Sequence, residues 1–138
     1  MTKDSNSSIR TPLGAARGLG SAKAGMHHWW MQRASAAALV PLSLYWLTCL
    51  PEMTTGTYAH FISWIGSPLV AILAILFIIA SFYHAVLGLQ VIIEDYVTSE
   101  GRKLALLMLN NFTFIALGAA CIFAILHISF SLHGYEAP

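Results

Sequence analysis

Three long apolar runs, separated by short polar segments, dominate the chain. They are Ala34–Leu50, Pro68–Ile93 and Leu104–Leu132. Each approaches or exceeds the ~20 residues that an α-helix needs to cross the hydrocarbon core of a bilayer. None alternates with the period of two that marks a membrane β-strand, and a helix satisfies its backbone hydrogen bonds internally. The pattern therefore predicts an all-α membrane protein with three transmembrane helices, at about residues 30–50, 68–95 and 104–132.

The composition indicates lipid rather than water as the main solvent. Apolar and aromatic residues make up 57% of the 138 residues and charged residues only 9%, against about 25% charge in an ordinary soluble domain. The net charge is only +1, and the sequence lacks the clustered basic residues of a nucleic-acid surface. We therefore expect membrane lipid and no nucleic acid among the partners. Cys49 and Cys121 lie in separate apolar runs, and we expect two buried free thiols.

Basic residues are distributed unevenly around the three runs. Five of the seven lie at or before Arg33, and the remaining two directly precede the third run. The positive-inside rule then places the N-terminus in the cytoplasm and the C-terminus in the periplasm. Residues 1–25 lack the apolar stretch of a secretory signal, so we expect a flexible cytoplasmic tail followed by a membrane domain at 26–138. Pro41 predicts a local kink in the first helix.

The second run contains an imidazole, and an ionisable group inside a membrane helix requires a physical reason. At ~100° per residue, His84 shares one helix face with Gly88 and Asp95, and the rise from His84 to Asp95 is about 16 Å. An unprotonated ring nitrogen of His84 can ligate haem iron, and Gly88 leaves room one turn away for a flat macrocycle. The alternatives are an interhelical hydrogen bond for His84 and a packing notch for Gly88.

Asp95 and Tyr96 lie where the second run meets the cytoplasm. A quinone that is reduced near an aqueous face must collect protons, so a phenol donor beside a titratable carboxylate suits such a site. Both residues could instead be ordinary anchors at the membrane interface.

These residues together resemble the small cytochrome b membrane anchor subunit of succinate dehydrogenase, respiratory complex II. The likeness is to the alphaproteobacterial form of this anchor, and it covers the three spans. It rests on His84 in the second span, with Gly88 four positions later and Asp95-Tyr96 beginning eleven positions later. The segment GMHHWWMQR at 25–33, followed by Ala-Ser-Ala at the mouth of the first span, is also similar.

The resemblance implies a single haem b that is shared with a second anchor subunit. His84 is then one axial ligand and the metal-binding residue, and a histidine of the larger cytochrome b anchor subunit is the other. Arg33 and His27 are implied to lie near the haem propionates, with His28 as the alternative to His27. A guanidinium at the membrane edge can pair with carboxylates while its stem stays in lipid, although Arg33 could also be a plain positive-inside anchor.

The resemblance further implies that Tyr96 and Asp95 belong to a ubiquinone site in the electron-transport chain. The implied partners are a flavoprotein subunit with FAD and an iron–sulfur subunit with Fe–S clusters, which carry electrons from succinate in the tricarboxylic acid cycle. This chain has neither a dinucleotide fingerprint nor the cysteines of a cluster, so we expect an enzyme subunit that is inactive alone. The expected location is the bacterial cytoplasmic (inner) membrane, as a multi-pass protein, or alternatively the mitochondrial inner membrane.

Three other functions stay open from the sequence. The chain could be a haem-free structural membrane anchor, or the anchor of a related menaquinol:fumarate reductase. A proton relay between His84 and Asp95 is the least favoured, because no polar side chain bridges the about 16 Å between them. The remaining spaced histidines are expected to have surface or interhelical roles; these are His60, His127 and His133.

Overall fold

The structure is a computed structural model that describes Leu13 and residues 23–134. Helices joined by short connections make up residues 23–134, and these helices are α2 (Lys23–Thr48), α3 (Leu50–Thr55), α4 (Tyr58–Ile65), α5 (Pro68–Tyr96) and α6 (Glu100–Gly134). The all-α prediction is confirmed for this part of the chain. The predicted flexible tail, residues 1–25, lies almost entirely outside the described residues, since α2 begins at Lys23.

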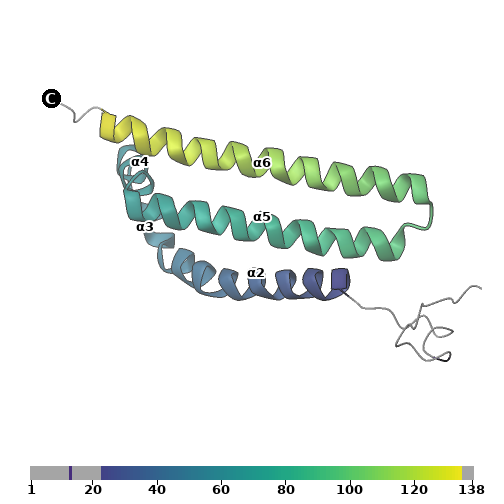
Figure 1. Ribbon diagram of the computed structural model, residues 1–138. Coiled ribbons are helices and arrows are strands. Elements are labelled where there is room, and N and C mark those ends of the chain that lie inside the picture. The colour runs from purple at the N-terminus through teal and green to yellow at the C-terminus, as the bar shows by residue number, and fades with distance from the viewer. Residues whose placement is uncertain (1–12, 14–22, 135–138) are drawn as a thin grey trace, which may run out of the picture.

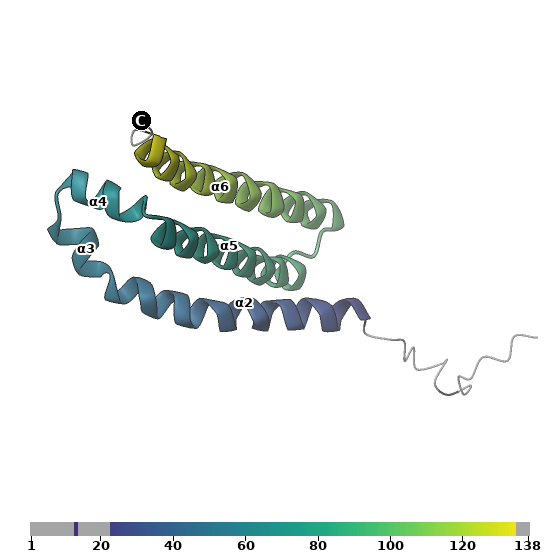
Figure 2. The ribbon, with the colours of Figure 1, turned by 60° about the vertical axis from the view of Figure 1, so that its left-hand side comes forward.

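The three long helices lie side by side in one row with α5 in the middle (Figures 1 and 2). α2 packs against one side of α5 and α6 against the other. The short helices α3 and α4 join α2 to α5 at one end of the row (Figure 2). Because the row is a single layer, large apolar side chains of all three long helices remain exposed in the isolated chain. Lipid or partner chains must cover these side chains.

Two of the three predicted spans have the length and apolar character of a membrane helix. They are Pro68–Tyr96 and Glu100–Leu132. α2 is less apolar because it includes Gln32 and Arg33. It also ends at Thr48, two residues before the predicted end of the first span. The crossing by α2 and the orientation of the chain therefore stay predictions, as does the local kink at Pro41, which lies inside α2.

The connection between the first two predicted spans is helical, which the sequence pattern does not anticipate. α3 begins with Pro51 in its first turn, a position where the missing proline N–H costs no hydrogen bond. α4 is capped by Thr57, whose hydroxyl accepts a hydrogen bond from the backbone N–H of His60 at 3.3 Å. The His60 ring then joins the two short helices, because its Nε2 lies 2.7 Å from Oε2 of Glu52.

Packing around α5 fixes its start and its middle. Near the α4 end, Ile65, Val70 and Ala74 form a buried cluster. Further along, buried Asn110 on α6 donates a hydrogen bond from Nδ2 to the backbone carbonyl of Val86 at 3.1 Å. This hydrogen bond fixes the level of α6 relative to the part of α5 that carries the candidate site.

The two cysteines differ in their surroundings. Both are free, Cys49 is buried, and Cys121 is exposed on α6. The prediction of two buried thiols is therefore right for Cys49 and wrong for Cys121, because the face of α6 that carries Cys121 has no neighbouring helix in this row.

Candidate functional site

His84 lies on the face of α5 that packs against α2, and two polar side chains of α2 meet its ring. Oγ of Ser35 is 3.0 Å from Nδ1 of His84. On the other side of the ring, Nε2 of Gln32 is 3.5 Å from Nε2 of His84. The first distance is that of a good hydrogen bond, whereas the second is long for one.

The hydrogen-bond network of Ser35 assigns the tautomer of His84. The Ser35 hydroxyl also donates to the backbone carbonyl of Gln32 at 3.0 Å, a bond back to the preceding turn that serines in helices often form. A hydroxyl has one hydrogen, so its oxygen must accept at His84, and Nδ1 of the ring must carry the proton. Nε2 then keeps its lone pair and can act as a metal ligand or as a hydrogen-bond acceptor.

A pocket of about 380 Å³ opens between α2 and α5 beside this ring. Its lining comes from both helices: His28, Trp29, Gln32, Arg33, Ala36, His84 and Val91. His84 and Val91 both reach the pocket, as their spacing on one helix face requires. Gly88 lies between them, and a Cβ atom there would be 3.6 Å from Nε2 of Gln32. Gly88 itself is not among the lining residues, and the Gln32 amide lies over it.

The N-terminal part of α2 brings positive charge to the rim of the pocket. The Arg33 guanidinium lies 4.4 Å from the ring centroid of Trp29, a cation–π contact that holds its plane in place. Nε2 of His28 is buried and has no hydrogen-bond partner among the described residues. Arg33 can pair with an anionic group such as a carboxylate, and the ring of His28 can hydrogen-bond to it.

The structure places His28, not His27, beside the pocket. His27 is exposed and is not among the lining residues. Neighbouring residues on a helix point about 100° apart, so only one of the two can face α5. The sequence motif does not distinguish His27 from His28, whereas the rotation of α2 about its axis does.

Asp95 and Tyr96 lie away from His84, at the end of α5, and both are exposed, Tyr96 by 81%. Neither lines the pocket. The neighbouring Glu94 accepts a hydrogen bond at Oε1 from Nε2 of Gln90 at 2.8 Å. The chain thus carries two separate polar regions on α5, about 16 Å apart along the helix.

Sequence reasoning missed the residues of α2 that contact His84, namely Ser35, Gln32 and, around the pocket, Trp29 and Ala36. A signal for the first two exists, because Gln32 and Ser35 are polar, lie three residues apart and therefore share a helix face at the mouth of an apolar run.

The other histidines lie apart from this pocket. His60 pairs with Glu52 as described, and His127 is exposed on α6, with its ring 6.1 Å from that of Phe123. The side chain of His133 lies outside the described part of the chain. Within the described residues, no group of three or more His, Cys, Asp or Glu side chains could hold a metal ion. A metal at His84 would therefore need ligands that the described residues do not supply.

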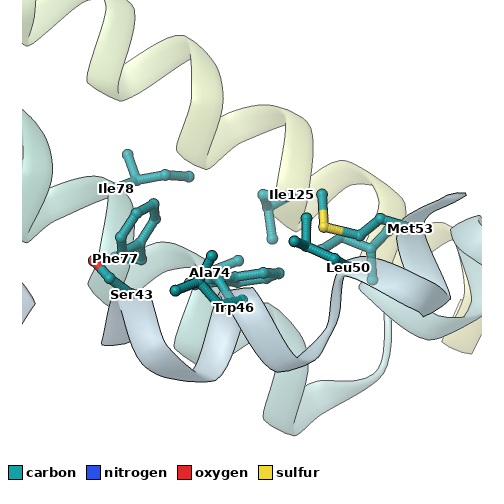
Figure 3. Close-up of a pocket in the computed structure, with 10 residues that line it drawn as sticks. Ser43, Trp46, Leu50, Met53, Ala74, Phe77, Ile78 and Ile125 are labelled. Atoms are coloured by element: carbon teal, nitrogen blue, oxygen red, sulfur yellow. The ribbon is translucent and has the colours of Figure 1, made fainter. Parts of the chain in front are cut away.

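A larger pocket, of about 530 Å³, lies at the other end of α2 and is almost wholly apolar (Figure 3). Figure 3 shows Trp46, Phe77 and Ile125 facing it from α2, α5 and α6. Ser43 supplies a hydroxyl at its edge. This lining offers no ionisable group, so the pocket near His84 is the better candidate for chemistry.

The sequence matches a known family over most of its length. Residues 7–129 match the model of the succinate dehydrogenase/fumarate reductase transmembrane subunit. The chain therefore belongs to this family, and the resemblance found in the residues around His84 is confirmed.

Individual relatives agree with the family match. A succinate dehydrogenase hydrophobic membrane anchor subunit of Rickettsia bellii is 37% identical over 101 residues, which cover 72% of this chain and 80% of the relative. The subunit of the same name from Paracoccus denitrificans is 31% identical over 110 residues, covering 80% and 85%. That of Rickettsia typhi is 30% identical over 108 residues, covering 78% and 86%. No solved structure matches this chain.

Proposed function

We propose that the chain is the hydrophobic membrane anchor subunit of a succinate dehydrogenase, that His84 is one axial ligand of a haem b, and that the cytoplasmic end of α5 forms part of a ubiquinone site. The relatives named above support the first part. The second rests mainly on one observation, the two short contacts of the Ser35 hydroxyl, to Nδ1 of His84 and to the Gln32 carbonyl, beside a pocket that is also lined by Arg33. These contacts imply that Nε2 of His84 keeps its lone pair.

The residues around the pocket fit a haem by their chemistry. His84 offers a neutral imidazole nitrogen. Gly88, one turn further along the same face, has no side chain, and a flat ring could lie against α5 there once the Gln32 amide, which now covers this glycine, turns aside. Arg33 and the unpartnered Nε2 of His28 suit the two propionates. Haem, when bound, supplies a one-electron redox centre. This chain forms only one side of the pocket, so the second ligand and the opposite wall come from the larger cytochrome b anchor subunit.

At the cytoplasmic end of α5, Tyr96 donates a hydrogen bond to a quinone carbonyl, and Asp95 exchanges protons with the aqueous phase. The exposure of both side chains supports this role, because it leaves them free to form a site with a partner chain. The iron–sulfur subunit, which passes on electrons from the flavoprotein subunit, covers this end of the row. Ubiquinone is the substrate, and the chain is inactive without its partners.

The anchoring role follows from the apolar faces of α5 and α6, which hold the complex in the bacterial inner membrane. With α2 as the third crossing, the N-terminus and the α5–α6 connection lie in the cytoplasm. Arg102 and Lys103 in the first turn of α6 then face the anionic headgroups on that side.

The experiment that tests haem ligation is replacement of His84 in the assembled complex. We expect His84→Leu to abolish or strongly alter the b-type absorption, because the substitution removes the imidazole that lines the pocket. A redox difference spectrum of the purified complex measures this. His127→Leu is the matched control, since it removes an exposed imidazole of α6 and should leave the spectrum intact. Retention of the wild-type spectrum in His84→Leu would exclude His84 as a ligand.

A haem-free anchor is the second candidate function, and one observation favours it. The ring of His84 already has hydrogen-bonding neighbours on both nitrogens within this chain, Ser35 and Gln32. In that case the imidazole only ties α2 to α5, and the purified complex would show no b-type spectrum even with wild-type His84.

A further inference from the structure

We infer that Ser35 is a positioning residue for His84: its hydroxyl fixes the tautomer and the orientation of the imidazole and makes Nε2 a stronger electron donor. The inference rests on the proposed haem ligation. Ser35 does not reach the pocket lining itself and acts only through the His84 ring.

His84, Ser35 and the backbone of Gln32 form a chain of two hydrogen bonds. It runs from Nδ1–H of His84 to Oγ of Ser35, and from that hydroxyl to the carbonyl of Gln32, with both distances 3.0 Å. In the opposite tautomer the hydroxyl hydrogen would point to Nδ1, and Oγ and the Gln32 carbonyl would face each other as two acceptors. Only the first arrangement makes hydrogen bonds of both short contacts.

The side chain of Ser35 is buried. Ser35 is 8% exposed, one of two buried polar residues in the described part of the chain. A hydroxyl or imidazole N–H in such a place destabilises the fold when it lacks a partner. The Ser35 contact therefore holds the ring firmly, although the two residues are 49 positions apart in sequence.

The hydrogen bond at Nδ1 of His84 also affects the other ring nitrogen, Nε2. A hydrogen bond donated by one ring nitrogen raises electron density on the other, so the ring binds a metal more strongly and favours its more oxidised state. Ser35 donates onward to a backbone carbonyl, and chained hydrogen bonds of this kind strengthen one another. A more basic axial ligand lowers the midpoint potential of haem. Loss of the hydroxyl should therefore raise that potential.

The weak contact on the other side of the ring fits this assignment. Nε2 of Gln32 lies at the long distance of 3.5 Å, and its Oε1 has no hydrogen-bond partner among the described residues. The amide of Gln32 is thus held only loosely over Nε2, whereas Ser35 holds Nδ1 at close range. α2 therefore contacts Nδ1 through a short hydrogen bond and Nε2 only through a long contact.

The test compares three variants of the complete complex: Ser35→Ala, Ser35→Thr and, as a control, Ser43→Ala. Ser43 lies on the same helix but lines the apolar pocket at the other end of α2. The readouts are the haem midpoint potential by redox titration and the low-spin signal of the oxidised haem by electron paramagnetic resonance. We expect Ser35→Ala to raise the potential and shift the signal. Ser35→Thr, which keeps the hydroxyl, and Ser43→Ala should match the wild type.

The remaining outcomes each support or overturn the role of Ser35. A wild-type potential and signal in Ser35→Ala would overturn it. Loss of haem in Ser35→Ala with retention in Ser35→Thr would support it, because only the hydroxyl differs in kind. Loss or an equal shift in both would overturn it in favour of a packing role. His84→Leu separates the two proposals: if that variant keeps the wild-type spectrum, haem ligation fails, whatever Ser35 does.

Discussion

The phenol of Tyr96 is a polar group whose partner must come from outside the chain. It is 81% exposed at the last residue of α5, and no hydrogen bond of its hydroxyl is seen within the described residues. A tyrosine at the membrane interface can keep its ring in the headgroup region and its hydroxyl in water. What separates a quinone ligand from such an anchor is whether the hydroxyl itself is needed.

Tyr96→Phe tests this need. If the hydroxyl bonds a quinone carbonyl, its loss removes a hydrogen bond worth about 0.5–1.5 kcal/mol, which lowers the efficiency of quinone reduction about 2- to 10-fold. Succinate oxidation by an artificial dye acceptor should stay near the wild-type rate. Steady-state assays of the assembled complex with both acceptors measure the difference.

Tyr58→Phe is the control for that experiment, because Tyr58 is equally exposed, at 80%, but lies at the opposite end of the row on α4. Equal loss of quinone and dye activity in Tyr96→Phe would point to assembly rather than to the quinone.

Among single residues, the sequence predicted those that stand out chemically on one helix. His84 is an imidazole in an apolar run and lines the pocket. Gly88 follows from it by helix geometry and lies on the same face of α5, under the amide of Gln32. Ser35 could not be predicted in the same way, because a serine in an apolar run has many possible neighbours. Its role depends on how α2 is rotated and set against α5, which is decided by packing between segments far apart in the chain. That His28 rather than His27 lines the pocket has the same cause.

At the scale of helices, the turn from α4 into α5 is closely packed against α6. Gly66 ends α4, and Ile128 and Leu132 of α6 pack directly on it. Its φ of −81° is open to any residue, so the glycine is needed for space and not for backbone conformation. Trp46 and Trp64 meet edge to face beside it, with centroids 5.9 Å apart. α2, α4 and α6 therefore all depend on this corner.

Gly66→Ala should loosen this corner. The new Cβ would lie 3.1 Å from the carbonyl oxygen of Ile62 and 3.2 Å from Cγ2 of Ile128, and it would overlap the end of Leu132. Overpacking of this kind costs about 1–3 kcal/mol, so the thermal midpoint of the detergent-solubilised complex should fall. Gly101→Ala is the control, since a Cβ there meets nothing within 4 Å. An unchanged midpoint in Gly66→Ala would show that α6 is not held at this corner.

The helices themselves were predictable to different degrees. α5 was predicted almost to the residue because Ser67-Pro68 marks its start and an apolar run fills it. α3 and α4 were not predicted, because the 51–67 segment is too short and too mixed in polarity for a periodic pattern. Packing in the folded chain holds α4 in place, because Ile65 at its end lies in the buried cluster with Val70 and Ala74 of α5.

At the scale of the whole molecule, a single row of helices encloses no site. The pocket at His84 is walled by α2 and α5 only, and the Asp95–Tyr96 end is open. Both candidate sites therefore lie on surfaces where another chain can complete them, as expected for one subunit of a complex. The arrangement of the row also bears on the membrane topology. If α5 and α6 cross the membrane, the direction in which α2 runs decides on which side of the membrane its charged N-terminal half and the pocket rim lie.

Cysteine labelling determines this direction. In a chain with Cys49 and Cys121 replaced by Ala, single cysteines at Met26, Tyr58 and Arg102 sample the start of α2, the α3–α4 corner and the start of α6, and all three positions are exposed. With an impermeant maleimide on intact bacterial cells we expect labelling at Tyr58→Cys alone, and labelling at Met26→Cys and Arg102→Cys only after permeabilisation. Equal access to Met26→Cys and Tyr58→Cys from outside would contradict a crossing by α2, and with it the proposed place of Arg33 at the cytoplasmic side.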